Sequence, residues 1–158
     1  MNILIAYYSW EGHTEKVVEV LASKLNASTE RIEPVKESNM GMKAIKAFLG
    51  MKSGIKPCKI NLSEIDHLVV ATPVWTGRPT PYINKYLSLL TNTQDKTFSV
   101  LVEMSTRGAE NTINKIQNAL EKKGMKYITS AVTLEDEVDA GKFDEAVSKL
   151  AESIKELE

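Results

Sequence analysis

The stretch ILIAYYSWEGHT, residues 3–14, combines the two patterns that decide the fold of this chain. Residues 3–8 form a short, continuous apolar run, which is typical of a strand buried on both faces of a parallel sheet. From residue 14 onward the spacing becomes helical, because apolar residues such as Val17 and Leu21 fall on one face. A buried strand that leads directly into an amphipathic helix is the repeating unit of α/β folds.

The same alternation continues along the chain. Further strands are predicted at residues 28–32, 68–71, 98–104 and 127–134, and helices at residues 14–25, 82–90, 112–123 and 143–157. Residues 40–54 carry the apolar spacing of one more short helix, limited by its glycines. Strands that alternate with helices about five times give right-handed crossovers and a parallel sheet covered on both faces. The prediction is one doubly wound, three-layer α/β domain over residues 1–158.

Composition narrows the classes of protein to consider. The chain has 158 residues, 42% of them hydrophobic and 26% charged, with a net charge of -1, which favours a compact domain and excludes disorder. The chain has no polybasic run, which argues against nucleic acid as the main partner. Its single cysteine, Cys58, excludes an internal disulfide. No apolar stretch approaches the ~18 residues of a membrane span, so we expect a cytoplasmic protein.

The loop at residues 9–14 joins the first strand to its helix. The first backbone N–H groups of a helix have no partner within it, and the helix dipole favours an anion there. Gly12 permits a tight turn, and the hydroxyls of Ser9 and Thr14 either contact such an anion or cap the helix. The loop has neither a Walker sequence nor GxGxxG, which leaves a single terminal phosphate as the expected ligand.

Two further loops follow strong strands and are expected at the same edge of the sheet. The loop at residues 72–81 is rich in proline and carries Trp75, which either stacks on a planar ligand or packs in the core. In the same loop, Gly77 allows backbone N–H groups to approach a ligand. The loop at residues 105–109 has short polar residues that suit hydrogen bonding through the backbone.

With these three loops in place, the chain resembles the flavodoxin-like family over nearly its whole length. The first loop matches the family's phosphate loop with Ser9, Trp10, Glu11, Gly12, His13 and Thr14. The two loops that contact the flavin ring in the family correspond to Pro73, Val74, Trp75, Thr76, Gly77 and Arg78, and to Ser105, Thr106, Arg107 and Gly108. The resemblance implies a five-stranded parallel sheet of order 2-1-3-4-5. It also implies FMN as the cofactor, with its phosphate on the first loop and its isoalloxazine between the other two.

Some residues depart from the family pattern. Glu11 stands where the family usually has a threonine, so a carboxylate lies in the expected phosphate loop. Arg78 and Arg107, two of the three arginines in the chain, lie in the ring loops, whereas typical flavodoxins are acidic around the flavin. The third loop also lacks the aromatic residue that many flavodoxins place there.

Three functions remain open from the sequence. The favoured function is a small electron carrier of the flavodoxin type, which docks redox partner proteins, a reductase and an acceptor. The second is an NAD(P)H-dependent quinone or flavin reductase of the same fold, acting on a small quinone or flavin. The third is a flavin-free interaction module, for which Glu11 is the main support. No catalytic residue and no metal site is predicted, and His13 and His67 are interpreted as structural. The segment of residues 40–53, which carries several lysines, is interpreted as an ordinary surface helix rather than a substrate or partner surface.

Overall fold

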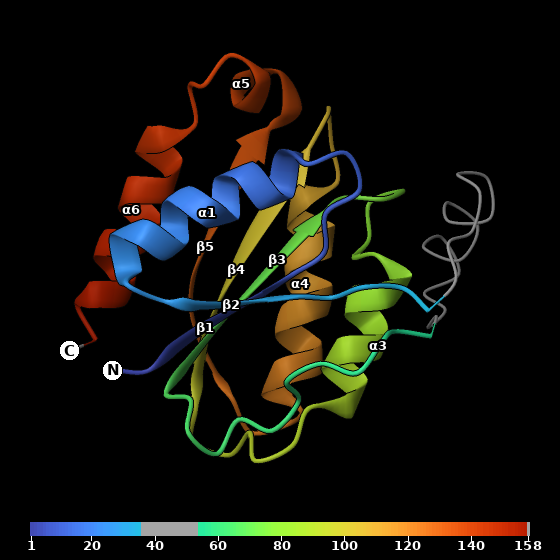
Figure 1. Cartoon of the computed structure of the whole chain (residues 1–158), viewed down its shortest axis with the longest axis vertical. Coiled ribbons are helices and arrows are strands. Elements are labelled where there is room, and N and C mark those ends of the chain that lie inside the picture. Colours follow the sequence, from blue (N-terminus) through green and yellow to red (C-terminus); the bar gives the residue numbers. More distant parts are fainter. Residues whose placement is uncertain (36–53, 158) are drawn as a thin grey trace.

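The computed structural model describes residues 1–35 and 54–157. In these residues, parallel strands alternate with helices along the chain (Figure 1). The strands are β1 (Ile3–Tyr7), β2 (Ser28–Arg31), β3 (His67–Pro73), β4 (Thr97–Met104) and β5 (Lys126–Leu134). The helices are α1 (His13–Leu25), α3 (Pro81–Leu89), α4 (Ala109–Glu121), α5 (Glu135–Asp139) and α6 (Asp144–Lys155).

The strands form one parallel sheet in the order β2-β1-β3-β4-β5, which confirms the predicted fold. Strand β1 pairs with β2 on one side and with β3 on the other. The chain therefore winds in one direction from β1 to β2 and in the other from β3 to β5. Ligands of such sheets bind at the carboxyl ends of the strands where the order reverses, and here that point lies between β1 and β3.

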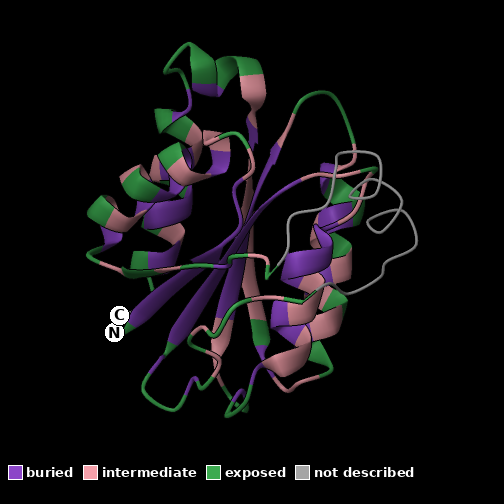
Figure 2. Ribbon diagram, turned by 45° about the vertical axis from the view of Figure 1, so that its right-hand side comes forward, coloured by how far each residue is buried: buried purple, intermediate pink, exposed green. Residues whose placement is uncertain are grey.

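Helices cover both faces of the sheet because side chains of the buried strands alternate between the faces. Ile3, Ile5 and Tyr7 of β1 belong to the core beneath α1, α5 and α6. Leu4 and Ala6 belong to the opposite core, which α3 and α4 cover. Figure 2 shows the buried strands running between these two helical layers.

The structure differs from the sequence-based prediction at two helices. Helix α4 begins at Ala109 instead of residue 112, because Gly108 adopts a left-handed conformation and forms its N-cap. Helix α5 was not predicted. It has only five residues, four of them acidic, and only Val138 is buried, so it has no apolar periodicity to detect. The short helix predicted within residues 40–54 lies outside the described residues.

The two ends of the described chain lie close together, at the amino ends of the strands (Figures 1 and 2). The loops that follow β1, β3 and β4 lie at the opposite edge of the sheet. Among the described residues, every helix is too short or too polar to cross a lipid bilayer.

Candidate functional site

A cavity of about 230 Å³ lies at the carboxyl edge of the sheet, beside the point where the strand order reverses. Segments that follow four different strands meet there: the loop after β1, the end of β3 with its loop, the end of β4 and the start of α5. Its walls are formed by Ser9, Trp10, Glu11, His13, Thr14, Pro73, Val74, Trp75, Glu103, Met104, Ser105 and Glu135.

The loop after β1 presents its backbone N–H groups in the way expected for an anion site. Gly12 has φ 98° and forms the N-cap of α1, and a Cβ added there would meet no atom within 4 Å. The backbone N–H groups of residues 11–14 donate no hydrogen bond to any residue that the structure describes. Such N–H groups at the start of a helix are a ready site for an anion.

The two hydroxyls of this loop have different roles. The Oγ of Ser9 accepts a hydrogen bond from the backbone N–H of Glu15 at 3.3 Å, so Ser9 satisfies one donor in the first turn of α1, although Gly12 is the N-cap. Thr14 is only 1% exposed, and its Oγ1 has no hydrogen-bond partner among the described residues. A buried polar atom without a partner costs about 1–3 kcal/mol. The hydroxyl of Thr14 is therefore available for a ligand in the cavity.

The lining of the cavity also includes three apolar side chains, those of Val74, Trp75 and Met104. The indole of Trp75 packs edge-on against Tyr8, with ring centroids 5.6 Å apart and an interplanar angle of 87°. The indole also packs edge-on against Tyr82, with the ring centroids 6.3 Å apart. Trp75 is thus both a packing residue and part of the cavity wall, and its two aromatic neighbours hold it in place.

The loops after β3 and β4 touch each other at two glycines. A Cβ added to Gly108 would lie 2.6 Å from the Cα of Gly77 and 3.0 Å from a methyl group of Val74. The side-chain amide of Asn111 donates a hydrogen bond to the carbonyl oxygen of Gly77 at 2.5 Å. Some of the predicted site residues do not line the cavity. They are Gly12, Thr76, Gly77, Arg78, Thr106, Arg107 and Gly108.

Sequence reasoning missed three residues of the wall, Glu103, Met104 and Glu135. Glu103 ends the apolar run of β4 and is only 6% exposed. Burial raises the pKa of its carboxyl, and the negative charges of Glu135 and Glu11 raise this pKa further. His13 and the nearby Thr14 hydroxyl lower it. An acidic residue at the end of a buried strand was a visible signal of a functional site.

The model of one protein family matches almost the entire chain. The description of this family is NADPH-dependent FMN reductase, and the match covers residues 1–155. The chain belongs to this family. The assignment confirms the predicted flavodoxin-like family and supports FMN as the cofactor of this family member. No curated protein sequence matches the chain.

Solved structures confirm the fold of this FMN reductase family member. It is similar to a flavoprotein from Lactobacillus acidophilus in complex with FMN, with 20% identity and a TM-score of 0.72, over 88% of this chain and 97% of the other. It is similar to oxidised Flavodoxin 2 from Bacillus cereus, with 18% identity and a TM-score of 0.67, over 100% of both chains. An NADH:FMN oxidoreductase aligns at 14% identity with a TM-score of 0.65, over 99% of this chain and 88% of the other.

The cavity of this family member fits the phosphate end of FMN in most respects. The N–H groups of residues 11–14 and the unpaired Thr14 hydroxyl are donors suited to phosphate oxygens. The carboxylates of Glu11, Glu103 and Glu135 line the same cavity and oppose a second negative charge. That the isoalloxazine lies between the two ring loops stays a prediction. The apolar residues of the cavity wall include Val74 and Trp75 from the first of these loops and Met104 at the end of β4.

Glu103→Gln should change how stability depends on pH. The folded protein holds the Glu103 proton to a higher pH than the unfolded chain does, since burial raises the pKa of this carboxyl above its ordinary value of 4.5. The wild type therefore loses stability as pH rises from 4.5 through the raised folded pKa. The glutamine variant lacks this loss, so its advantage in unfolding free energy should appear across that window and persist above it. Denaturant unfolding at several pH values measures the difference, and Glu110→Gln at an exposed position of α4 is the control. An advantage that does not change with pH would contradict the prediction.

Proposed function

We propose that the protein binds FMN in the cavity at the carboxyl edge of the sheet and uses it to oxidise NADPH. The observation that carries this proposal is a set of free donors: the backbone N–H groups of residues 11–14 and the buried Thr14 hydroxyl have no hydrogen-bond partner among the described residues. Membership of the NADPH-dependent FMN reductase family supports the choice of electron donor. A quinone or a second flavin is the class of acceptor that this activity implies. FMN supplies the redox chemistry when bound, and the protein supplies binding and orientation.

Different residues of the cavity bind the phosphate, hold the loop in shape and contact the ring. The N–H groups of residues 11–14 and the Thr14 hydroxyl hold the phosphate, with help from the dipole of α1. Ser9 keeps the loop in this shape through its hydrogen bond with Glu15. Trp75, fixed by Tyr8 and Tyr82, provides a rigid apolar wall that excludes water from one side of a planar ligand.

An electron carrier of the flavodoxin type is the second candidate. The alignment with Flavodoxin 2 from Bacillus cereus, which covers 100% of both chains, favours it, because the chain has the dimensions of a carrier. A carrier exchanges electrons with redox partner proteins and does not react with NADPH directly.

Anaerobic mixing of the FMN-loaded protein with NADPH tests the proposal. A reductase should lose its flavin absorbance with NADPH alone, in a stoichiometric reaction. A carrier should keep its absorbance until light or a partner reductase supplies electrons. A purified protein that is colourless and takes up no added FMN would contradict both functions and favour the flavin-free module.

Glu11→Thr should bind FMN at least as tightly as the wild type when a chelator removes metal ions. Glu11 is exposed and lines the cavity beside the phosphate loop, so its carboxylate repels the cofactor phosphate. Quenching of FMN fluorescence during a protein titration measures the affinity. Glu19→Thr, on the exposed face of α1, is the matched control for a change of charge alone. Distinctly weaker binding by Glu11→Thr in chelator would mean that this side chain holds the cofactor.

A further inference from the structure

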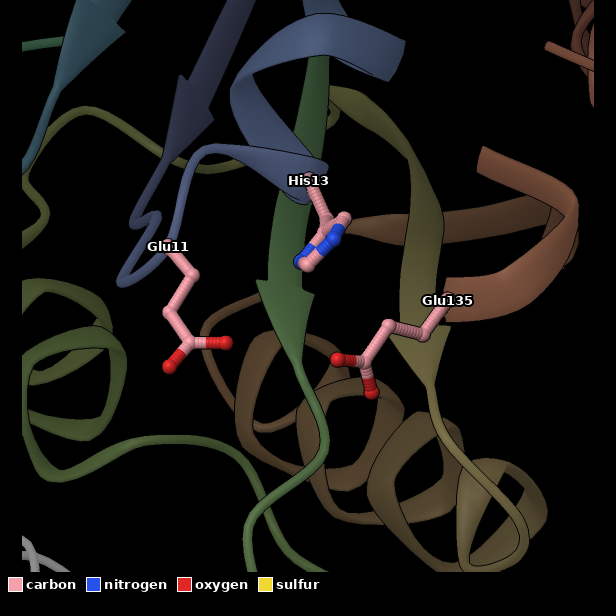
Figure 3. Close-up of side chains that lie close together, drawn as sticks. All are labelled: Glu11, His13 and Glu135. Carbon is pink, nitrogen blue, oxygen red and sulfur yellow. The ribbon is translucent and has the colours of Figure 1, made fainter. Parts of the chain in front are cut away.

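Three ionisable side chains of the cavity wall lie close together (Figure 3). They are Glu11 in the loop after β1, His13 at the start of α1 and Glu135 at the start of α5. One ligand atom from each lies within 4.8 Å of the others. Figure 3 shows His13 between the two glutamates, with both carboxylates extending toward the space beneath its ring.

Two buried polar side chains face the same cavity. The Thr14 hydroxyl is 1% exposed and has no hydrogen-bond partner among the described residues. The Glu103 carboxyl is 6% exposed and lines the same cavity. A buried hydroxyl without a partner among the described residues, beside a buried carboxyl and a cluster of two carboxylates and an imidazole, points to a positively charged ligand.

His13 is oriented as metal-binding histidines usually are. Its Nε2 lies 3.0 Å from a carboxylate oxygen of Asp139. A carboxylate on one ring nitrogen fixes the ring and leaves the other nitrogen for a metal ion, which is the common arrangement around metal-binding histidines. The short helix α5 provides both Asp139 and Glu135, one at each end.

We propose that Glu11, His13 and Glu135 bind one divalent transition-metal ion, and that a phosphate group on residues 11–14 completes its coordination. The second part rests on the proposed function, since FMN is the expected source of that phosphate. Mixed imidazole and carboxylate ligands suit ions such as Zn²⁺, Fe²⁺ and Mn²⁺. Ligand atoms around such an ion lie roughly 2.0–2.2 Å from it.

An ion at this position explains why carboxylates line a phosphate site. Glu11, Glu103 and Glu135 repel a phosphate dianion when no cation is present. A divalent cation between the carboxylates and the phosphate reverses the sign of this interaction. Glu11 then becomes a ligand, so Glu11→Thr should bind FMN more weakly than the wild type when the ion is present.

Titration of the chelator-treated protein with Mn²⁺, followed by electron paramagnetic resonance, tests the ion site without any flavin. We expect one Mn²⁺ per chain, displaced by Zn²⁺, and at least ten-fold weaker binding by Glu135→Gln and by Glu11→Gln. Glu137→Gln, in the same helix but outside the cluster, is the matched control and should bind Mn²⁺ like the wild type. Absence of binding, or equal binding by all four proteins, would overturn the proposal.

Repeating the Mn²⁺ titration with FMN, and separately with inorganic phosphate, tests the coordination by phosphate. Each should raise Mn²⁺ affinity in the wild type and not in Glu135→Gln, and Mn²⁺ should raise FMN affinity by the same factor. Unchanged Mn²⁺ affinity with both probes would overturn this part. FMN binding in chelator is a separate measurement. If FMN never binds, the proposed function fails, while the inorganic phosphate titration still decides the question of coordination.

Discussion

Thr14→Val should weaken FMN binding at least ten-fold and, in the same protein, raise the free energy of unfolding without cofactor. The two effects have opposite signs because the buried Thr14 hydroxyl has no hydrogen-bond partner among the residues that the structure describes. Valine has nearly the same shape and removes the cost of that unpaired group, which is about 1–3 kcal/mol. It also removes a hydrogen bond to a charged phosphate, worth about 1.5–3 kcal/mol. Fluorescence titration with FMN and denaturant unfolding of the cofactor-free protein measure the two changes.

Thr112→Val provides the control for this experiment. Thr112 in α4 is also buried with an unpaired hydroxyl, but it does not line the cavity. Its valine variant should gain stability and leave FMN affinity unchanged. Equal FMN affinities for the wild type and Thr14→Val would show that the phosphate does not contact Thr14. A loss of stability in Thr14→Val would show that its hydroxyl already has a partner.

Gly108→Ala should destabilise the cofactor-free protein by about 2–5 kcal/mol. The left-handed backbone, with φ 100°, costs a non-glycine residue about 1–2 kcal/mol. The added Cβ also lies 2.6 Å from the Cα of Gly77, so the two loops must separate, and overpacking of this kind costs about 1–3 kcal/mol. Separation of the loops displaces Val74 and the adjoining cavity wall, so FMN affinity should fall as well.

Gly12→Ala separates these two contributions. Gly12 is also a helix N-cap, with φ 98°, but a Cβ added there meets no atom within 4 Å. Its alanine variant should therefore show only the backbone cost, about 1–2 kcal/mol in denaturant unfolding. Equal losses of stability in the two variants would mean that the contact between Gly77 and Gly108 adds nothing to the fold.

The sequence allowed the sheet to be predicted because its strands are local features. Strands β1, β3 and β4 are short, largely apolar runs, and the run in β1 leads into a helix with a clear apolar face, whereas β2 is polar and mostly exposed. The loop that joins β1 to α1 was also predictable, since its residues are consecutive, and its binding of phosphate stays a prediction. The resemblance to the flavodoxin-like family then supplied the strand order, which no local pattern contains.

The contacts across the cavity depend on the fold and left little signal in the sequence. Glu135 reaches His13 only because β5 ends beside β4 and leads directly into α5, a helix without apolar periodicity. The meeting of Gly77 and Gly108 depends on the register that places Pro73 opposite Glu103 in the sheet. Such long-range pairings are set by the assembled sheet, and for this reason no local pattern in the sequence indicated the contact between the two glycines.

The position of the chain ends suggests how this protein can be attached to a surface or fused to another protein. Both ends of the described chain lie at the amino edge of the sheet, and the cavity lies at the carboxyl edge (Figure 1). A linker attached at either end therefore leaves the cavity facing away from the point of attachment. An electrode surface or a fused enzyme tethered there leaves the edge of the sheet that carries the cavity open to solution, and both ends offer the same geometry for immobilisation.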